Sequence, residues 1–553
     1  NFVGSNVVDP RITFTRSSNA TYYDGKTQAL AEQNLLLYSQ EFDNVVGWVL
    51  GTGVTVTANT TVAPNGTLTA DSVSFASGGL SEFLRTYPVL IVGQVYTISI
   101  YALLISGTPT FTFDIGNAQP SSAQTPTGSW QRFSYTFTFS GSNNWIDIQT
   151  DTSGTIAFWG AQLEQRSAAT AYVPTTNQSI SRYQPVLITA SANTPRLDYD
   201  PVTLAPKGLL IEEQRVNLLL RSYELENPSW SKIGLTATTG YWAPDGTLTA
   251  SLLTDTTTAE GLVNQSITSP TIATYTFSCF MKKAQNRYVA LQLTGAGLAV
   301  QYVSFDLDNG GSSLVGAGSP VATVIPYGNG WFRCCITATT VSTATLTPAI
   351  YAAKGPLYTD RGPLDVDGTP LQYVWGAQLE VGSNVTSYIP TVASQITRTA
   401  DIATMTGTNF SSWYRQDEGT MFSELIVRLD IDQNAFGITN SGFASGTRLR
   451  KTQTNTIRFV ARDPTARDIE QTPSPVLTAD QSLKIAGAYK TNDLAITGNG
   501  QTPTIGTVFT PITADRAWIG GSSSSGAPFN GHVRSIRYYP KRLSDSILRG
   551  ITK

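Results

Sequence analysis

A tandem duplication is the feature of this sequence that most constrains its fold. Two long segments carry the same short phrases in the same order, and the second segment is the longer one. A fixed order of matched phrases indicates two copies of one folding unit, so a fold assigned to one copy must also suit the other. The matched phrases are NLLLYS (34–39) and NLLLRS (217–222), APNGTLTA (63–70) and APDGTLTA (243–250), and WGAQLE at 159–164 and 375–380.

Each copy contains short runs in which apolar and polar residues alternate, such as YTISIYALL (96–104) and YTFSCFMKK (275–283). Alternation with a period of two indicates strands that are buried on one face. Turn signals of the Asn-Gly and Asp-Gly kind separate the runs, and no amphipathic helical window appears. The pattern predicts two jelly-roll β-sandwiches, at 31–180 and 209–395.

The composition fits an all-β chain of several domains. At 553 residues the chain exceeds what one hydrophobic core supports, so three or four domains are expected. Only 14% of the residues are charged, and 41% are apolar, which is enough for packed cores. We therefore expect sandwiches or barrels throughout.

The segments outside the duplication predict connectors and a third sandwich. ITFTR with ATYYD near the start, and PRLDYDP before GLLIE, have the proline spacing of extended, loop-rich segments. We expect a collar or connector at 1–30 and a second connector at 181–208, which orient successive modules. The region 402–553 has a different character and ends in the strand NGHVRSIRYYP and the helix-like LSDSILRG.

Charge and residue usage exclude several classes of function. The net charge of −3, without a cluster of Lys and Arg, argues against nucleic-acid binding. No stretch approaches the length and apolar character of a membrane-spanning helix, so no membrane insertion is expected. Cys279, Cys334 and Cys335 are interpreted as small core residues rather than a disulfide framework. With His532 as the one histidine, histidine-based zinc sites and catalytic triads are excluded.

The order of the phrases ITFTR…ATYYD, NTPRLDYDP, KGLLIEEQRVNLLLRS, VWGAQLE and TSYIPT resembles that of bacteriophage tail-fibre and spike proteins. The tail NGHVRSIRYYPKRLSD is similar to the last strand of the laminin-G-like, concanavalin-A-like sandwiches found in the same proteins. The resemblance covers nearly the whole chain. It implies tandem jelly-roll modules like carbohydrate-binding domains, followed by a laminin-G-like sandwich at 402–553.

The same resemblance implies a place on the surface of a virion that is assembled in the host cytoplasm. The implied partners are other virion proteins and the polysaccharide of the host surface. It also implies self-association as a homotrimer, for which the sequence itself supplies no heptad seam. Several weak sites on one particle would then gain avidity.

Five residues are candidates for glycan binding, because aromatic rings stack on the apolar faces of sugars while polar groups bind hydroxyls. Tyr101 and Phe280 fall at matched positions of the two copies, where the alternatives are a glycan platform and ordinary packing. Trp413, Tyr414 and Arg415 lie in the polar segment SSWYRQDEG. The repeated tryptophans Trp159 and Trp375 are expected in the core instead.

No residue is predicted to be catalytic. Glu212 with Glu213, and Asp306 with Asp308, come nearest to a carboxylate pair, but a glycosidase needs two carboxyls across a cleft. Asp306 and Asp308 are interpreted as solvated acids of a turn. No cofactor is predicted, and no motif supports a structural calcium ion, although jelly rolls can hold one.

These observations predict a non-enzymatic virion fibre or spike component that binds host surface polysaccharide. Two alternatives remain open at the level of sequence. One is a capsule-degrading depolymerase or esterase, which requires a cleft lined by paired acids. The other is a structural decoration protein of the virion without a ligand.

Overall fold

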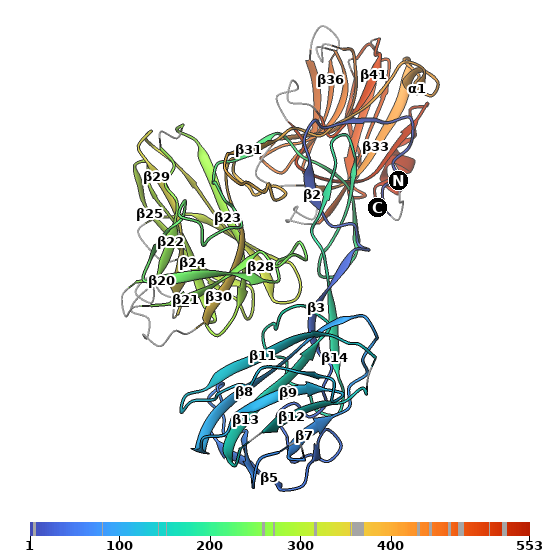
Figure 1. Cartoon of the computed structure of the whole chain (residues 1–553). Helices are drawn as coiled ribbons and strands as arrows, with labels where there is room; N and C mark the ends of the chain where they lie inside the picture. Colours follow the sequence, from blue (N-terminus) through green and yellow to red (C-terminus); the bar gives the residue numbers. More distant parts are fainter. Residues whose placement is uncertain are drawn as a thin grey trace. The chain divides into compact units, whose positions relative to one another are not determined.

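The computed structural model describes residues 1–553 except 4–6, 80, 142, 151, 257–259, 269–270, 315–317, 354, 357–369, 428–431, 442–444, 463–465, 474–480, 508, 512 and 522–527. The described residues form strands β1 to β42 and two short helices, α1 and α2 (Figure 1). The predicted all-β class is confirmed. The chain divides into two compact units, residues 28–184 and residues 1–27 with 185–553.

The first unit is a jelly-roll sandwich, the first module. Its described residues form two five-stranded antiparallel sheets around a core that includes Trp48 and Phe158. One sheet has the order β4 (Val49–Leu50), β7 (Phe83–Thr86), β12 (Ile146–Thr150), β9 (Phe111–Ile115), β10 (Gln119–Pro120). The other has the order β5 (Val54–Thr61), β6 (Ala70–Phe75), β13 (Gly154–Glu164), β8 (Val95–Gly107), β11 (Gln131–Thr138).

The second module, residues 218–395, repeats this arrangement with one more strand in each sheet as far as the structure describes them. Trp230 occupies its core as Trp48 does in the first module. One sheet has the order β19 (Ser231–Ile233), β22 (Leu262–Asn264), β29 (Leu346–Ala353), β24 (Tyr288–Gly295), β25 (Leu298–Asp306), β26 (Gly311–Leu314). The other has the order β20 (Leu235–Tyr241), β21 (Ala250–Asp255), β30 (Pro370–Val381), β23 (Thr274–Lys283), β28 (Trp331–Thr339), β27 (Val321–Pro326).

The third sandwich is discontinuous in sequence. Among the described residues it has two seven-stranded sheets. One has the order β1 (Thr13–Thr15), β32 (Ile402–Thr406), β41 (Arg516–Ile519), β34 (Gln433–Thr439), β35 (Gly446–Lys451), β36 (Ile457–Arg462), β37 (Ala466–Gln471). The other has the order β16 (Arg196–Tyr199), β17 (Pro206–Ile211), β42 (Gly531–Tyr539), β33 (Glu418–Val427), β38 (Ser482–Lys490), β39 (Asp493–Gly498), β40 (Thr504–Gly506).

These pairings correct the expected boundaries of the third sandwich and of the connectors. β1 pairs with β32, and β16 and β17 join β42, so the sandwich extends beyond 402–553 into the segments expected at 1–30 and 181–208 and into the first residues of the module expected at 209–395. Such segments are too short to show a clear strand pattern. Their pairing could not be recognised either, because their partners lie hundreds of residues away in the chain. Both modules are therefore insertions between strands of one sandwich.

Short two-stranded ladders carry the chain out of the sandwich and back. Four of these strands lead to the first module: β2 (Ala20–Tyr22) pairs with β15 (Ile188–Ala190), and β3 (Gln28–Asn34) pairs with β14 (Ile180–Pro185). β18 (Arg215–Asn217) pairs with β31 (Ile396–Arg398), and these two strands lead to the second module and back. We call β2 and β15 with their flanking residues, 17–27 and 185–192, the stalk.

Several local predictions are confirmed. The helix-like segment LSDSILRG contains most of helix α2 (Asp545–Ile551). Helix α1, a single turn at Thr408–Ser411, was not predicted. The three cysteines are buried in the second module and are not disulfide-bonded. Trp159 and Trp375 are buried as expected. A separate observation is that no helix in the described part of the chain is long and apolar enough to cross a membrane.

Candidate functional site

The first module carries an aromatic cluster on one of its sheets. Trp159 lies at its centre, with ring centroids 5.5 Å from Tyr101 and 4.7 Å from Tyr172. The indole Nε1 donates a hydrogen bond to Thr69 Oγ1 at 3.1 Å, which fixes the ring. Trp159 is buried, whereas Tyr101, Tyr172 and the neighbouring Trp130 are half-buried.

Arg132 lies in the same cluster. Its guanidinium carbon is 5.3 Å from the Tyr101 ring centroid, a cation–π arrangement. Nη2 donates to Ser99 Oγ at 2.9 Å, and Nη1 donates to the Thr170 carbonyl at 2.5 Å. We call Tyr101, Trp130, Arg132, Trp159 and Tyr172 the first aromatic face.

The WGAQLE phrase produces this geometry through a bulge. The register of β13 on β8 shifts between Trp159 and Gln162, and Gly160 between them has φ +65°. A side chain at Gly160 would be strained by this φ and would approach Tyr101 and Tyr172 to 3.3–3.4 Å. The repeated glycine therefore lets both tyrosines close around the tryptophan.

The second module has the same cluster at the matched positions. Phe280 lies 5.4 Å from Trp375, and Trp375 lies 4.6 Å from Tyr388. Arg333 repeats the contacts of Arg132, with its guanidinium carbon 5.0 Å from the Phe280 centroid and Nη1 donating 2.7 Å to the Thr386 carbonyl. We call Phe280, Trp331, Arg333, Trp375 and Tyr388 the second aromatic face.

The second aromatic face is covered by other parts of its own unit. Tyr23 and Leu187 of the stalk belong to its buried cluster, and Leu187 N donates to the Pro244 carbonyl at 2.9 Å. Tyr327, which follows β27, lies 4.8 Å from Phe280 and 5.5 Å from Tyr23. Of the two alternatives for Phe280, a glycan platform and ordinary packing, the structure shows packing: its ring is fully buried, because covering segments come from distant parts of the sequence.

A cavity of about 200 Å³ opens in the third sandwich. Trp413 and Tyr538, with ring centroids 5.0 Å apart, form part of its wall. Arg11 Nε and Nη2 donate to the carboxylate of Asp9 at 3.0 and 2.6 Å, and this charged pair also lines the cavity. The remaining lining residues are Asn1, Phe2, Ile12, Met405, Phe436, Ala517, Ile519 and Ile536.

Helix α1 positions the tryptophan of this cavity. Phe410, buried in the sandwich core, lies 5.1 Å from Trp413 and holds one edge of the indole. Nε1 of Trp413 donates to the Asn409 carbonyl at 2.6 Å. The indole is thus oriented by both contacts and remains half-buried at the cavity wall.

The other two predicted residues of the segment SSWYRQDEG point elsewhere. Tyr414 stacks on Phe410 at 4.7 Å and lines a separate, much smaller cavity, and burial raises its pKa to about 12. Arg415 is exposed, and its hydrogen bond lowers the pKa of Asp417 to about 2. Sequence reasoning identified Trp413 but missed Tyr538, Arg11 and Asp9, which converge from both ends of the chain.

The acidic candidates are engaged in ion pairs. Asp306 accepts from Arg287 Nε and Nη2 at 2.8 and 2.6 Å, and Lys283 Nζ donates to Asp308 at 2.8 Å. The Arg287 hydrogen bonds hold the pKa of Asp306 well below its usual value. These acids stabilise a turn. Among the described residues, no group of three or more His, Cys, Asp or Glu could hold a metal ion.

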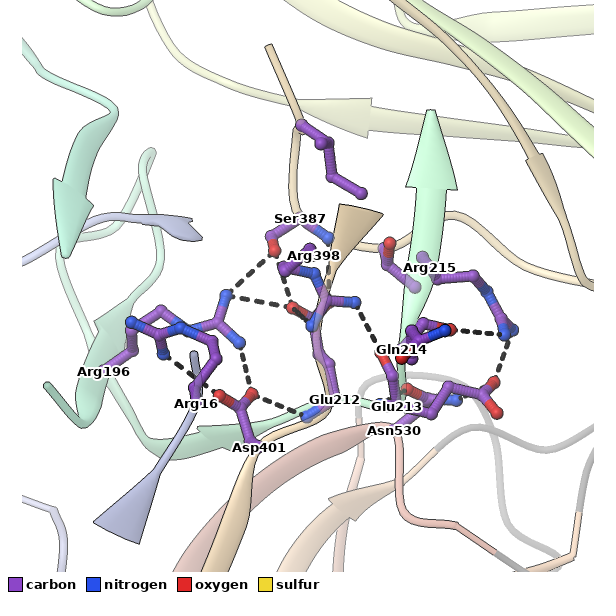
Figure 2. Close-up of polar contacts among 12 residues, drawn as sticks. Arg16, Arg196, Glu212, Glu213, Gln214, Arg215, Ser387, Arg398, Asp401 and Asn530 are labelled. Atoms are coloured by element: carbon purple, nitrogen blue, oxygen red, sulfur yellow. Dashed lines mark hydrogen bonds and ion pairs between the residues drawn. The ribbon is translucent and has the colours of Figure 1, made fainter. Parts of the chain in front are cut away.

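Glu212 belongs to a buried ionic network between the second module and the sandwich (Figure 2). The network also reaches the stalk, because Arg16 Nη2 donates to the Ser191 carbonyl at 2.8 Å and Arg196 Nη1 donates to the Thr21 carbonyl at 3.1 Å. Arg196 Nη1 lies 2.9 Å from Glu212, and Arg398 Nη1 lies 3.4 Å from it. Ser387 of the second module donates to both carboxylate oxygens, at 2.8 Å from N and 2.6 Å from Oγ. Glu213 pairs instead with Arg215 and with Asn530 of the sandwich.

Asp401 completes the network. Its two oxygens accept from Arg16 Nη1 at 3.0 Å and Arg196 Nη2 at 2.5 Å, and Glu212 N donates to it at 2.9 Å (Figure 2). The side chains of Arg16, Arg196 and Asp401 have no solvent exposure. Buried charges persist only when paired, so this network has a structural role in joining the three parts.

Acid is expected to weaken this joint. Burial alone would raise the pKa of Glu212, but the charges of Arg398 and Arg196 and the Ser387 hydrogen bonds outweigh it, so the pKa lies well below the usual 4.5. When the pKa of a carboxyl group is lower in the folded than in the unfolded state, its ionised form stabilises the folded chain. This stabilisation is complete at pH values above the unfolded-state pKa and is lost progressively as the pH falls from there toward the folded-state pKa. Urea denaturation between about pH 6 and about pH 3 should show this loss.

The matched variant for this measurement is Glu212→Gln. It should be less stable than the parent chain at neutral pH and should lose less stability on acidification. Equal losses in the two proteins would contradict a role for the ionised Glu212.

No family model matches this chain, and no curated protein matches it. Among solved structures, the chain is similar to the CBM40 of the Ruminococcus gnavus IT-sialidase, with 17% identity over 25% of this chain and 84% of that chain and a TM-score of 0.22. The CBM22-1–CBM22-2 tandem of Paenibacillus barcinonensis Xyn10C shows 13% identity over 65% and 100%, with a TM-score of 0.21. Mouse laminin α1 domains LG4-5 show 12% identity over 52% and 88%, with a TM-score of 0.20.

Proposed function

We propose that this chain is a non-enzymatic fibre or spike component of a virion that binds host surface polysaccharide in the Trp413 cavity. The observation that carries the proposal is the lining of that cavity, where the rings of Trp413 and Tyr538 stand beside the charged pair Arg11–Asp9. A sugar ring has apolar faces that stack on aromatic rings and hydroxyls that pair with carboxylate and guanidinium groups.

The polar pair has hydrogen-bonding capacity to spare. Arg11 uses Nε and Nη2 for Asp9, whereas a guanidinium has five N–H donors and a carboxylate has about four acceptor sites. The side chains are 50% and 35% exposed, so a ligand hydroxyl can reach both. Such mixed donors and acceptors suit neutral or acidic sugars.

The lining favours binding over cleavage. Asp9 is the one carboxylate among the cavity residues that the structure describes. Glycoside hydrolysis by the usual mechanisms needs two carboxyl groups that face each other across the substrate. We therefore favour an adhesin over a depolymerase. We also infer that the chain forms a homotrimer on the virion surface, in which several copies raise a weak single-site affinity by avidity.

Replacing Trp413 with alanine is expected to weaken polysaccharide binding at least about tenfold, because it removes the stacking surface of the cavity. The measurement is a titration of the full chain with purified surface polysaccharide from candidate hosts, with reducing ends assayed in the same samples. Trp413→Phe should retain much of the affinity. Tyr183→Ala, which removes a tyrosine that is 62% exposed in the first module, is the control.

The outcomes separate the three functions. Saturable binding without new reducing ends, weakened by Trp413→Ala alone, supports the proposal. New reducing ends would replace it by a depolymerase, and absence of binding across the panel would leave a structural virion component.

A further inference from the structure

The sheet that carries the aromatic face differs between the two modules at one edge. In the second module β27 pairs with β28 along six residues, from Val321 opposite Thr337 to Pro326 opposite Phe332. The chain then places Tyr327 against Phe280. An added strand and an aromatic ring at its end thus close both the sheet edge and the aromatic face.

The first module has the same edge without that strand. β11, the counterpart of β28, pairs with β8 on one side and is the last strand of its sheet in the described residues. Unpaired backbone N–H and C=O groups along a strand edge bind a further strand unless the edge is protected. An eight-residue edge of this kind is long enough to template one.

The usual protection of an edge is missing from β11. Its sequence, QRFSYTFT, contains no proline, lysine or acidic residue. Its single charge, on Arg132, is drawn into the aromatic face by contacts with Ser99 and the Thr170 carbonyl. Aromatic and β-branched residues make up most of the rest, which favours strand pairing.

The aromatic face next to this edge is also open within the first module. Tyr101 and Tyr172 are half-buried, whereas their counterparts Phe280 and Tyr388 are buried beneath the stalk and Tyr327. The internal geometry of the two faces is the same within a few tenths of an ångström, for example 5.5 and 5.4 Å for the central ring pair. The two faces therefore present similar chemistry to an occupant.

We propose that β11 and the first aromatic face together form a docking surface for an extended strand donated by another polypeptide chain. The strand adds antiparallel to β11, as β27 does to β28, and its last residues place an aromatic ring over Tyr101. The partner is an uncharged, β-branched segment that ends in an aromatic residue, in the manner of VATVIPY at 321–327. This surface is separate from the Trp413 cavity and does not depend on the proposed function.

A donated strand would fill both the open edge of β11 and the open aromatic face, whereas a glycan would fill only the aromatic face. Stacking on Tyr101 and Tyr172 would serve a sugar, but only a polypeptide backbone satisfies a row of alternating donors and acceptors along β11. The second module supplies the precedent in the same chain, where backbone pairing and ring contact come from one segment.

The test uses the full chain and a fluorescent synthetic peptide of residues 319–328, SPVATVIPYG. In an antiparallel pair, alternate residues direct their N–H groups to the neighbouring strand. Two further peptides carry N-methyl groups on one or the other alternate set of residues. We expect saturable binding of the unmodified peptide, at least about tenfold weaker binding for one methylated peptide, and little change for the other.

Variants of the first module assign the site. Tyr101→Ala and Ser134→Lys, which puts a charge beside the open edge, should each weaken peptide binding several-fold, whereas Tyr101→Phe and the exposed-tyrosine control Tyr183→Ala should not. Loss of affinity only in variants at the first module also excludes displacement of the chain's own β27.

Three results would overturn the proposal. They are absence of saturable binding, equal binding of both methylated peptides, and binding that is unaffected by Tyr101→Ala and Ser134→Lys. A neutral hexasaccharide such as cellohexaose that binds where the peptide does not, with loss in Tyr101→Ala, would assign the face to glycans instead.

Discussion

Asp401→Asn is expected to lower the free energy of unfolding of the third sandwich by about 3–5 kcal/mol. The substitution keeps the size of the side chain but removes the charge that faces Arg16 and Arg196, both of which are inaccessible to solvent. Breaking one partner of a buried ionic network leaves uncompensated charge in a medium that solvates it poorly. The effect should be read from hydrogen exchange in peptides that cover β32 and β42.

An exposed ion pair of the same sandwich is the control. Arg458 Nε lies 2.7 Å from Glu470, and the two side chains are 36% and 40% exposed. Glu470→Gln should cost only about 0–1 kcal/mol, because solvent screens such pairs. If Asp401→Asn cost no more than this control, the network would not be what joins the stalk, the second module and the sandwich.

The duplication allowed the module folds to be predicted, because the signal was repeated and local. Matched phrases such as WGAQLE form matched strands, with the same bulge and the same tryptophan contacts in both copies. Alternation of apolar residues marked the strands because one face of each is buried. These features depend on neighbours in sequence, so the sequence alone reveals them.

The discontinuous sandwich could not be predicted in the same way. β1 is three residues long, and its partner β32 lies almost four hundred positions further along the chain. Neither strand has a turn signal that points to the other. The available signal was chemical: Arg16 directly follows β1, Arg196 begins β16 and Arg398 ends β31, and arginines in such short strands need buried acids when they are themselves buried.

The candidate site was predictable only in part for a related reason. Trp413 stood out because it lies in a polar segment, but the residues that complete its cavity come from both ends of the chain. Phe280 matched Tyr101 in the alignment of the copies, yet its cover comes from Tyr23, Leu187 and Tyr327. A repeat predicts equal local structure and does not predict which copy the rest of the chain will cover.

Trp375→Ala should therefore destabilise the chain more than Trp159→Ala, although the two tryptophans are equivalent in sequence. Trp375 lies in a closed cluster whose neighbours Phe280 and Tyr388 are buried, so the lost ring leaves a cavity that water cannot fill. Such a change costs about 3–5 kcal/mol. Around Trp159 the half-buried Tyr101 and Tyr172 can move inward, and water can enter, so the cost should be smaller.

The measurement is hydrogen exchange in peptides from β23 and from β8, which report on each module within the full chain. The fluorescent strand peptide adds a second readout, because docking on the first aromatic face should partly protect β8 and β11 without changing β23. Equal costs for the two tryptophan variants would show that the first face is as closed as the second, and that no surface is left there for a partner to bind.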